Sequence, residues 1–482
     1  MFTPVMFVSV LPEILILILA VILLCVEPFW KEDQRRNAGW LTAGGLFAII
    51  VVSLLFGRPG EPTSTFGDMI RYDWLGFFFK ILFMFAAAIT ALLLMDHEKA
   101  GQRGEAYLLL LASLIGMNLM AVSADLIMLY LAIETASIPL YILAGFILTD
   151  NRSTEAGFKY LLFGTLASTV MLYGFSLIFG FTGTTNLYRI SELFAFGEIS
   201  VSLAFGIFAL VLVGLGFKIA VVPFHFWAPD VYQGSPTPVA GFLSTASKAA
   251  GFAVVLRFFF VAFPDYAPSW TVMLAVLSAI TMTVGNLLAM SQTNIKRLLA
   301  YSSIAHAGYA MVGVVAFSEL GAASVIFYLA AYIATNLLAF GVVMAFSSVA
   351  GADDIKDFSG MSRRNPWLAL MMLCAFLSLA GMPPFGGFVA KVFVFAAGVE
   401  ANYTWLVVVG ILNSILGVYY YLNAMKYVYL YRMPNEDEEN HPIPLPRPYA
   451  IALAVLTIGV ILIGTVFAPW FSWSSAAALN LF

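Results

Sequence analysis

The chain has 482 residues, of which 62% are hydrophobic and only 10% are charged. Because soluble globular proteins carry roughly 25% charged residues, this composition excludes a soluble domain and predicts a polytopic membrane protein. The formal net charge of −4 argues against a nucleic-acid partner. The two cysteines, Cys25 and Cys374, are too few for an iron–sulfur cluster, which takes about four thiolates.

Apolar runs of about 20 residues, separated by polar or Pro/Gly-rich loops, predict fourteen transmembrane helices. The first run lacks a basic n-region and a small-residue cleavage site, so we expect a retained span rather than a signal peptide. The seventh and twelfth runs contain helix breakers. The expected spans are 5–27, 38–57, 73–95, 105–122, 124–148, 154–181, 201–226, 238–263, 269–290, 297–317, 321–349, 366–396, 402–431 and 448–470.

Loop charge predicts the orientation of these helices, because cytoplasmic loops collect lysine and arginine. Loops after even-numbered helices carry only Arg58, Arg71 and Arg189. We therefore expect the loops after odd-numbered helices to be cytoplasmic and both termini to lie on the opposite side. The loops after odd-numbered helices carry thirteen basic residues: Lys31, Arg35, Arg36, Lys99, Arg103, Arg152, Lys296, Arg297, Lys356, Arg363, Arg364, Arg432 and Arg447.

Five ionisable residues are expected well inside the membrane: Glu134, Lys218, Lys248, His306 and Lys391. Each costs at least about 2.5–3.5 kcal/mol on insertion scales. Any one of them alone would fit a structural ion pair, but five in one chain favour a proton relay. Other ionisable residues lie nearer helix ends, where long side chains are expected to reach the interface: Glu13, Lys80, Lys159, Arg257 and Lys426.

Prolines are predicted to break two of the helices that carry lysine. A proline removes a helical hydrogen bond and leaves the carbonyl four residues earlier without its donor. Pro223 does this to Ile219, beside Lys218. Broken helices at membrane depth are tolerated where they line a polar cavity, and they recur at transporter ion sites.

The same reasoning applies to the twelfth span. Pro383 and Pro384 are expected to free the carbonyls of Leu379 and Ala380, shortly before Lys391. A glycine pair follows the prolines and loosens the next turn. The two lysines are therefore both expected beside irregular backbone inside the membrane.

An internal repeat is suggested, but two registers compete. Glu134 and His306 are 172 residues apart, and Lys218 and Lys391 are 173 apart. Aligning the Pro-Phe pair at 223–224 with the pair at 384–385 instead gives 161. Both registers remain open at this point.

Burial disfavours the charged form of a lysine, and a nearby carboxylate restores it. A buried lysine therefore releases its proton more readily when a carboxylate partner moves away. Glu134 is the natural movable partner for Lys218. Moving one charge against 100 mV takes about 2.3 kcal/mol, which such a change of partner would supply.

Three stretches carry a family resemblance: PFHFWAPDVYQGSPTPVAGFLSTASKAAGF, NLLAMSQTNIKRLLAYSSIAHAGY and LAGMPPFGGFVAKVFVF. They resemble the antiporter-like membrane subunits of respiratory complex I, over about residues 10–470. The resemblance implies an all-α polytopic membrane protein with about 14 transmembrane helices, two inverted five-helix repeats (helices 4–8 and 9–13) and broken helices 7 and 12. It implies one membrane domain, 1–482, made of 1–104 (helices 1–3), 105–263 (first repeat), 269–431 (second repeat) and 448–470 (last helix).

The resemblance also implies roles for particular residues. Glu134 and Lys218 match the family's glutamate–lysine pair, and Lys248 matches a connecting lysine. His306 could bridge Lys248 and Lys391, the lysine that matches the second half-channel. The site residues expected on this basis are Glu134, Lys218, Lys248, Lys391, His306 and His225, with no metal site.

The function implied is that of a non-redox, proton-translocating subunit of an NADH:quinone oxidoreductase in the inner (cytoplasmic) membrane. No cofactor is expected on this chain; NADH, FMN, iron–sulfur clusters and quinone would belong to other subunits. The expected partners are other membrane-arm subunits, especially neighbouring antiporter-like and small multi-pass subunits, and membrane lipids. Two alternatives stay open: a subunit of a multisubunit Na⁺/H⁺ antiporter, and a structural spacer.

Overall fold

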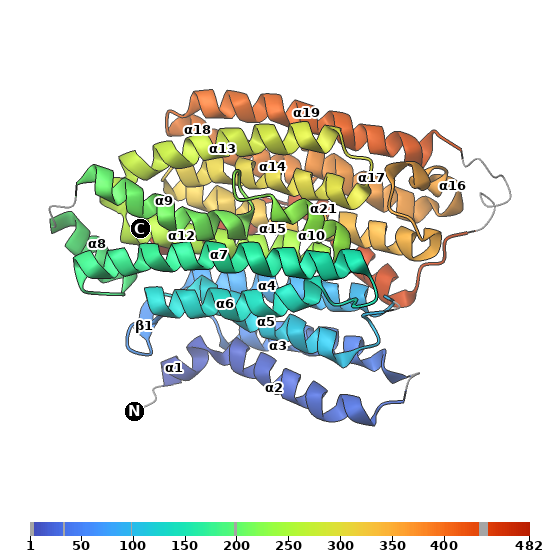
Figure 1. The fold of residues 1–482 in the computed structure, drawn as a ribbon, viewed down its shortest axis with the longest axis horizontal. Helices are drawn as coiled ribbons and strands as arrows, with labels where there is room; N and C mark the ends of the chain where they lie inside the picture. Colours follow the sequence, from blue (N-terminus) through green and yellow to red (C-terminus); the bar gives the residue numbers. More distant parts are fainter. Residues whose placement is uncertain (1–3, 32–33, 98, 197–199, 433–441) are drawn as a thin grey trace.

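The computed structural model describes residues 4–31, 34–97, 99–196, 200–432 and 442–482. In this part of the chain, thirteen helices are long and apolar enough to cross a membrane, and a shorter apolar helix covers Pro366–Ala380. The helices lie side by side along the long axis of the molecule (Figure 1). The expected all-α polytopic membrane fold is confirmed.

The elements follow one another with short connections. Up to the middle of the chain they are α1 (Pro4–Ser9), α2 (Leu11–Val26), η1 (Glu27–Phe29), α3 (Asn37–Phe56), β1 (Thr63–Thr65), β2 (Ile70–Tyr72), α4 (Trp74–Leu94), α5 (Gly104–Val122), α6 (Leu126–Ala144), α7 (Asn151–Thr182), α8 (Leu187–Phe196), α9 (Val201–Ile219) and α10 (Trp227–Gly234). The strands β1 and β2 pair antiparallel, with Ser64 opposite Arg71.

The second part of the chain continues the same pattern. Its elements are α11 (Thr237–Phe242), η3 (Leu243–Ser247), α12 (Lys248–Ala262), η4 (Pro264–Tyr266), α13 (Ala267–Met290), α14 (Ile295–Val315), α15 (Glu319–Ala350), η5 (Ile355–Phe358), α16 (Met361–Arg364), α17 (Pro366–Ala380), α18 (Gly386–Glu400), α19 (Thr404–Tyr429), α21 (Arg447–Thr465), α22 (Ala468–Ala478) and η6 (Leu479–Leu481).

Both expected breaks are present, and they share one geometry. Helix α9 ends at Ala220, which adopts a left-handed conformation with φ 56°, three residues before Pro223. Helix α17 ends at Gly381, with φ 83°, three residues before Pro384. A left-handed residue after the last helical turn is a common helix terminator. The expected spans 201–226 and 366–396 therefore end early as helices, and the half-helices α10 and α18 follow.

The expected span 238–263 also contains an irregularity. A π-helical segment, η3, joins α11 to α12 and ends directly before Lys248. Such π segments are rare and are found mostly at functional sites. The irregular turn therefore marks the position of one predicted site residue.

The helices carrying Lys248 and His306 form the centre of the molecule. Every residue in the most apolar stretch of Thr237–Ala262 and of α15 is buried, and so are 94% in α14. The corresponding stretch that begins with α2 is only 28% buried. Helices α2 and α3 accordingly lie at the edge of the ribbon in Figure 1.

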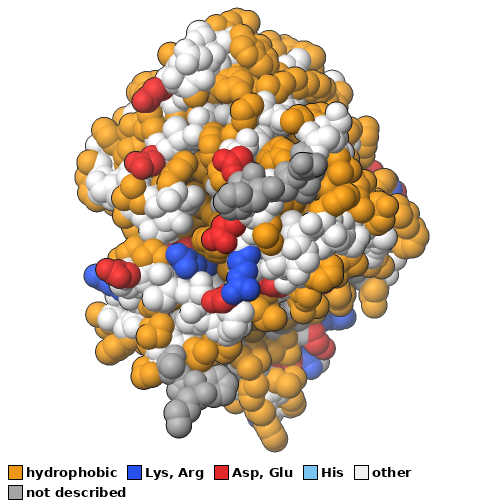
Figure 2. Space-filling model, turned by 90° about the vertical axis from the view of Figure 1, so that its left-hand side faces the viewer, with side chains coloured by type: hydrophobic (Ala, Val, Ile, Leu, Met, Phe, Trp, Pro, Cys, Tyr) orange, Lys and Arg blue, Asp and Glu red, His pale blue; other side chains and the backbone are white. Residues whose placement is uncertain are grey.

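The C-terminus and α1 lie at one end of the molecule, with α8 and the β1–β2 hairpin, and α16 lies at the other end (Figure 1). Figure 2 views the first of these ends. Charged side chains gather near the middle of that end face, and hydrophobic side chains occupy much of its rim. A rim of this kind suits contact with lipid or with other membrane proteins.

Candidate functional site

Lys218 is buried near the end of α9, with 3% of its surface exposed. Its ammonium donates a hydrogen bond to the hydroxyl of Ser137 on α6 (2.6 Å). Glu134 lies one turn earlier on α6 and is close enough to act on Lys218 electrostatically, yet no ion pair joins the two among the described residues. One carboxylate oxygen of Glu134 is buried and has no hydrogen-bond partner in the described chain. The structure therefore gathers the predicted pair around a serine that sequence reasoning missed.

Lys248 is buried at the start of α12. Its ammonium donates to the backbone carbonyl (2.9 Å) and to the hydroxyl (2.8 Å) of Ser303 on α14. Ser303 was not predicted either, although it lies in a motif quoted above. The contact joins the connecting lysine to the helix that carries His306.

His306 lies one turn further along α14, inside a cluster of tyrosines. Its Nδ1 is hydrogen-bonded to the hydroxyl of Tyr328 on α15 (2.7 Å), and its Nε2 lies 3.4 Å from the hydroxyl of Tyr421 on α19. The hydroxyl of Tyr421 is also hydrogen-bonded to that of Ser302. A histidine with hydroxyls on both ring nitrogens can take a proton on one side and release it on the other.

Lys391 occupies the break between α17 and α18. Its ammonium donates to the carbonyls of Leu379 (3.0 Å) and Ala380 (3.0 Å) and to the hydroxyl of Ser414 on α19 (2.8 Å). The two carbonyls are those that the prolines were predicted to free. The C-terminus of a helix favours a cation, so the end of α17 is a natural place for this ammonium.

Gly381 makes room for that lysine. A Cβ atom at this position would lie 2.8 Å from Cδ and 3.1 Å from Nζ of Lys391. The residue also has a positive φ of 83°, a conformation that residues with a Cβ atom rarely adopt. Glycine therefore suits this position, because it tolerates the positive φ and leaves room for the lysine side chain.

His225 is buried in the segment between α9 and α10. Its ring packs against that of Phe226, with centroids 4.5 Å apart. Its Nδ1 is buried and has no hydrogen-bond partner in the described chain. The structure thus places His225 in the first break, and within the described part of the chain no hydrogen bond joins it to the other predicted site residues.

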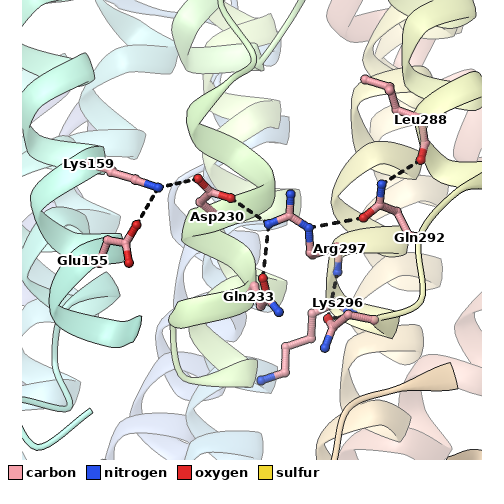
Figure 3. Close-up of polar contacts among 9 residues, drawn as sticks. Glu155, Lys159, Asp230, Gln233, Leu288, Gln292, Lys296 and Arg297 are labelled. Atoms are coloured by element: carbon pink, nitrogen blue, oxygen red, sulfur yellow. Dashed lines mark hydrogen bonds and ion pairs between the residues drawn. The ribbon is translucent and has the colours of Figure 1, made fainter. Parts of the chain in front are cut away.

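A charged network joins α7, α10 and α14 at the end of the molecule away from the termini. Asp230 lies between Lys159 and Arg297 and contacts both at 2.6 Å (Figure 3). Arg297 also donates to Gln233 (3.1 Å) and Gln292 (3.2 Å). Burial raises the pKa of Asp230, but its bonds to the two cations outweigh this and hold the pKa below the usual range. This network ties the half-helix α10 to both neighbours, and sequence reasoning missed it.

A polar cavity of about 380 Å³ lies at the same end. It is lined by ends of several helices, including His97, Asp150, Arg152 and the ion-paired Lys296 and Asp353 (2.8 Å). Burial, together with the charge of Lys296, lowers the pKa of His97 to about 4. Within the described ranges, no group of three or more His, Cys, Asp or Glu residues could hold a metal ion.

Three residues expected to reach the membrane interface are instead buried in ion pairs, so that expectation was wrong for them. Lys80 pairs with Glu13 at 2.9 Å. Arg257 holds Asp73 through two nitrogens, at 2.8 and 3.0 Å. Each of these buried charges has a partner, as it must, because an unpaired charge at such a place would be strongly destabilising.

Buried lysines and a histidine are linked to hydroxyls in an all-α membrane fold, and two of the lysines lie beside helix breaks. This arrangement defines the class of ion-translocating membrane proteins. Residues 123–417 match the family model described as NADH:quinone oxidoreductase/Mrp antiporter, transmembrane. The chain belongs to this family. The predicted resemblance is confirmed.

Curated relatives are named NADH-quinone oxidoreductase subunit N. The one from Moorella thermoacetica is 44% identical over 424 residues, covering 88% of this chain and 88% of the relative. The one from Trichlorobacter lovleyi is 41% identical over 434 residues, covering 89% and 88%.

Solved structures have the same fold. A chain of respiratory complex I from Thermus thermophilus with bound aureothin superposes with a TM-score of 0.80 at 32% identity, covering 96% of this chain and 98% of that one. A chain of the Mrp complex from a Dietzia species gives 0.85 at 21% identity, covering 98% and 97%. At that identity the second match shows the fold alone.

Proposed function

We propose that this chain is a proton-translocating membrane-arm subunit of an NADH:quinone oxidoreductase, a non-redox part of a translocase. The curated relatives named above support the complex. The observation that carries the mechanism is the series of buried ammonium and imidazole groups that are bonded to hydroxyls across helices α6 to α19.

The proposed path begins at Lys218, whose proton affinity depends on Glu134 and on the Ser137 hydroxyl. Lys248 and Ser303 form the middle of the path. From there His306 and its tyrosine hydroxyls lead towards Lys391 at the second break. Each of these groups can exist with or without its proton, which a relay requires and a structural ion pair does not.

We place the protein in the inner membrane as a multi-pass protein, with the loops after odd-numbered helices on the cytoplasmic side. The thirteen basic residues of those loops support this orientation. A single cysteine introduced near Arg363 should then react with an impermeant reagent from the cytoplasm, and one near Asp265 from the other side. The opposite labelling pattern would overturn the orientation.

Neighbouring membrane subunits would complete the site at α6. Glu134 is partly exposed on a helix face whose apolar members are open: Ile127, Leu131, Ile138 and Ile142 are each more than half exposed. A carboxylate facing lipid at this depth would be costly. We therefore propose that another membrane-arm subunit covers this face. The NADH, FMN, iron–sulfur and quinone chemistry would belong to other subunits of the complex.

Purifying the tagged chain from its own membranes tests the assignment. We expect other membrane-arm and redox subunits to copurify, and NADH-driven proton uptake by inverted vesicles to stop when Lys218 is replaced by alanine. Sodium-dependent transport without those redox subunits would support the antiporter alternative. Normal pumping in the alanine variant would favour the structural spacer.

A further inference from the structure

The ring of Tyr309 on α14 contacts two residues of the proposed relay. The ammonium of Lys391 is 4.9 Å from the centre of this ring. The ring also meets the imidazole of His306 edge to face, with centroids 5.6 Å apart and an angle of 87° between the planes. Phe395 of α18 packs against the same ring at 6.2 Å.

The hydroxyl of Tyr309 is hydrogen-bonded to a residue outside the proposed relay. It accepts a hydrogen bond from the side-chain amide of Asn286 on α13 (2.9 Å). That amide also donates to the carbonyl of Met282 (2.8 Å) and accepts from the hydroxyl of Tyr420 (3.1 Å). Asn286 is 1% exposed, so the ring of Tyr309 is held from its far end by a buried, fully engaged amide.

The surroundings of Lys391 make this ring important. Among the described residues, no carboxylate forms an ion pair with Lys391. Its hydrogen-bond acceptors are two neutral carbonyls and one hydroxyl, and α21 presents the apolar Ile463 at the start of α18. Among the titratable groups described around this site, Tyr309 of α14 lies against the ammonium and His306 of α14 interacts with it electrostatically. Tyr328 from α15 and Tyr421 from α19 are in turn hydrogen-bonded to His306.

We propose that Tyr309 is a positioning residue whose ring stabilises the ammonium form of Lys391, and that Asn286 holds that ring in place. The negative face of an aromatic ring attracts a cation, most strongly where water is excluded. The ring favours the protonated lysine and leaves the neutral amine unaffected. The inference rests on the proposed function, because it concerns how readily Lys391 gives up a relayed proton.

The test is the pH dependence of NADH-driven proton pumping in inverted vesicles that contain the whole complex. Replacing Tyr309 with leucine should move the alkaline limb of the profile to lower pH by about 0.5–1 unit. Tyr309→Phe keeps the ring and should leave the limb near its original position. Asn286→Leu frees the ring and should give a smaller shift in the same direction.

The electrostatic effect of the ring at position 309 can be separated from its shape by variants that leave no cavity. Phenylalanine analogues with increasing fluorination at position 309 keep the ring's size while weakening its negative face, and should shift the limb step by step. Phe395→Leu is the matched control, since it removes a ring from the same cluster without touching the ammonium, and should not shift it.

Equal effects of phenylalanine and leucine at position 309, or no response to fluorination, would overturn the inference. In that case Lys391→Ala would still abolish pumping if the proposed function holds. Full pumping in Lys391→Ala would instead reject the relay role of Lys391 itself, which separates the two failures.

Discussion

Each of the two broken helices carries a buried lysine, but the lysine lies on a different side of the break in each. Lys218 precedes the left-handed residue that ends α9, whereas Lys391 follows the one that ends α17. Yet Lys391 reaches back to the carbonyls of Leu379 and Ala380, the last turn of the first half-helix. Lys218 thus stands in the last turn before its break, whereas Lys391 sends its ammonium back to the corresponding turn before the other break.

Their partners differ. Among the described residues, the Lys218 ammonium has one hydrogen-bond acceptor, the Ser137 hydroxyl, and a carboxylate nearby on α6. The Lys391 ammonium has three neutral oxygens and an aromatic ring. We infer that the charge of Lys218 depends on Glu134, whereas the charge of Lys391 is supported by dipoles fixed in the fold.

Removing Lys218 should have the largest effect. Lys218→Ala should leave an assembled complex whose coupled turnover falls by roughly 10²-fold, the lower range for a positioned proton donor. NADH-driven pumping in vesicles, normalised to the amount of assembled complex, measures it. Normal turnover and stoichiometry in this variant would remove Lys218 from the path.

Lys391 should also be essential, and arginine should not replace it fully. Lys391→Ala should lower coupled turnover by more than about tenfold. Lys391→Arg keeps the charge but releases its proton far less readily, since the guanidinium pKa exceeds about 12. Full activity of the arginine variant in the same vesicle assay would show that only the charge matters.

Glu134→Gln should impair turnover less than loss of either lysine. The change keeps the side-chain volume and removes the charge that acts on Lys218, so assembly should persist. In a double-mutant cycle, Glu134→Gln and Ser137→Ala should be coupled through Lys218 by about 0.5–3 kcal/mol. Additive effects on pumping rate would show that the two residues act independently.

Ser414→Ala should have the smallest effect. The Lys391 ammonium would lose one of its three oxygen acceptors, and a typical hydrogen bond contributes about 0.5–1.5 kcal/mol. We therefore expect a two- to tenfold loss of pumping, measured beside Ser472→Ala, which removes an exposed serine hydroxyl from α22. A loss as large as that in Lys391→Ala would mean that Ser414 itself carries the proton.

Apolar runs predicted the helices, and the prolines predicted both breaks and the carbonyls that Lys391 uses. The sequence could not reveal Ser137, Ser303 or Ser414, because each lies on another helix and is an ordinary hydroxyl until the helices pack. Arg257 and Lys80 were misplaced for a similar reason. Their partners Asp73 and Glu13 are distant in sequence, and only packing shows that the pairs are buried.

The two competing repeat registers can now be compared with the geometry. The left-handed residues 220 and 381, and the prolines 223 and 384, are related by an offset of 161. The spacing of 173 between the lysines differs because they stand on opposite sides of their breaks. An alignment guided by functional residues alone would therefore misplace the helix ends.

The contacts of Arg257 restrict how α12 could move. Its guanidinium donates to Asp73, to the hydroxyl of Tyr188 and to the carbonyl of Ala121, which clamps one end of the helix. The other end joins the π-helical turn before Lys248. Converting that turn to α-helix would rotate the adjoining segment by about 100°, one residue's share of a helical turn. Because these contacts hold α12, such a conversion would turn α11 while Lys248 keeps its place.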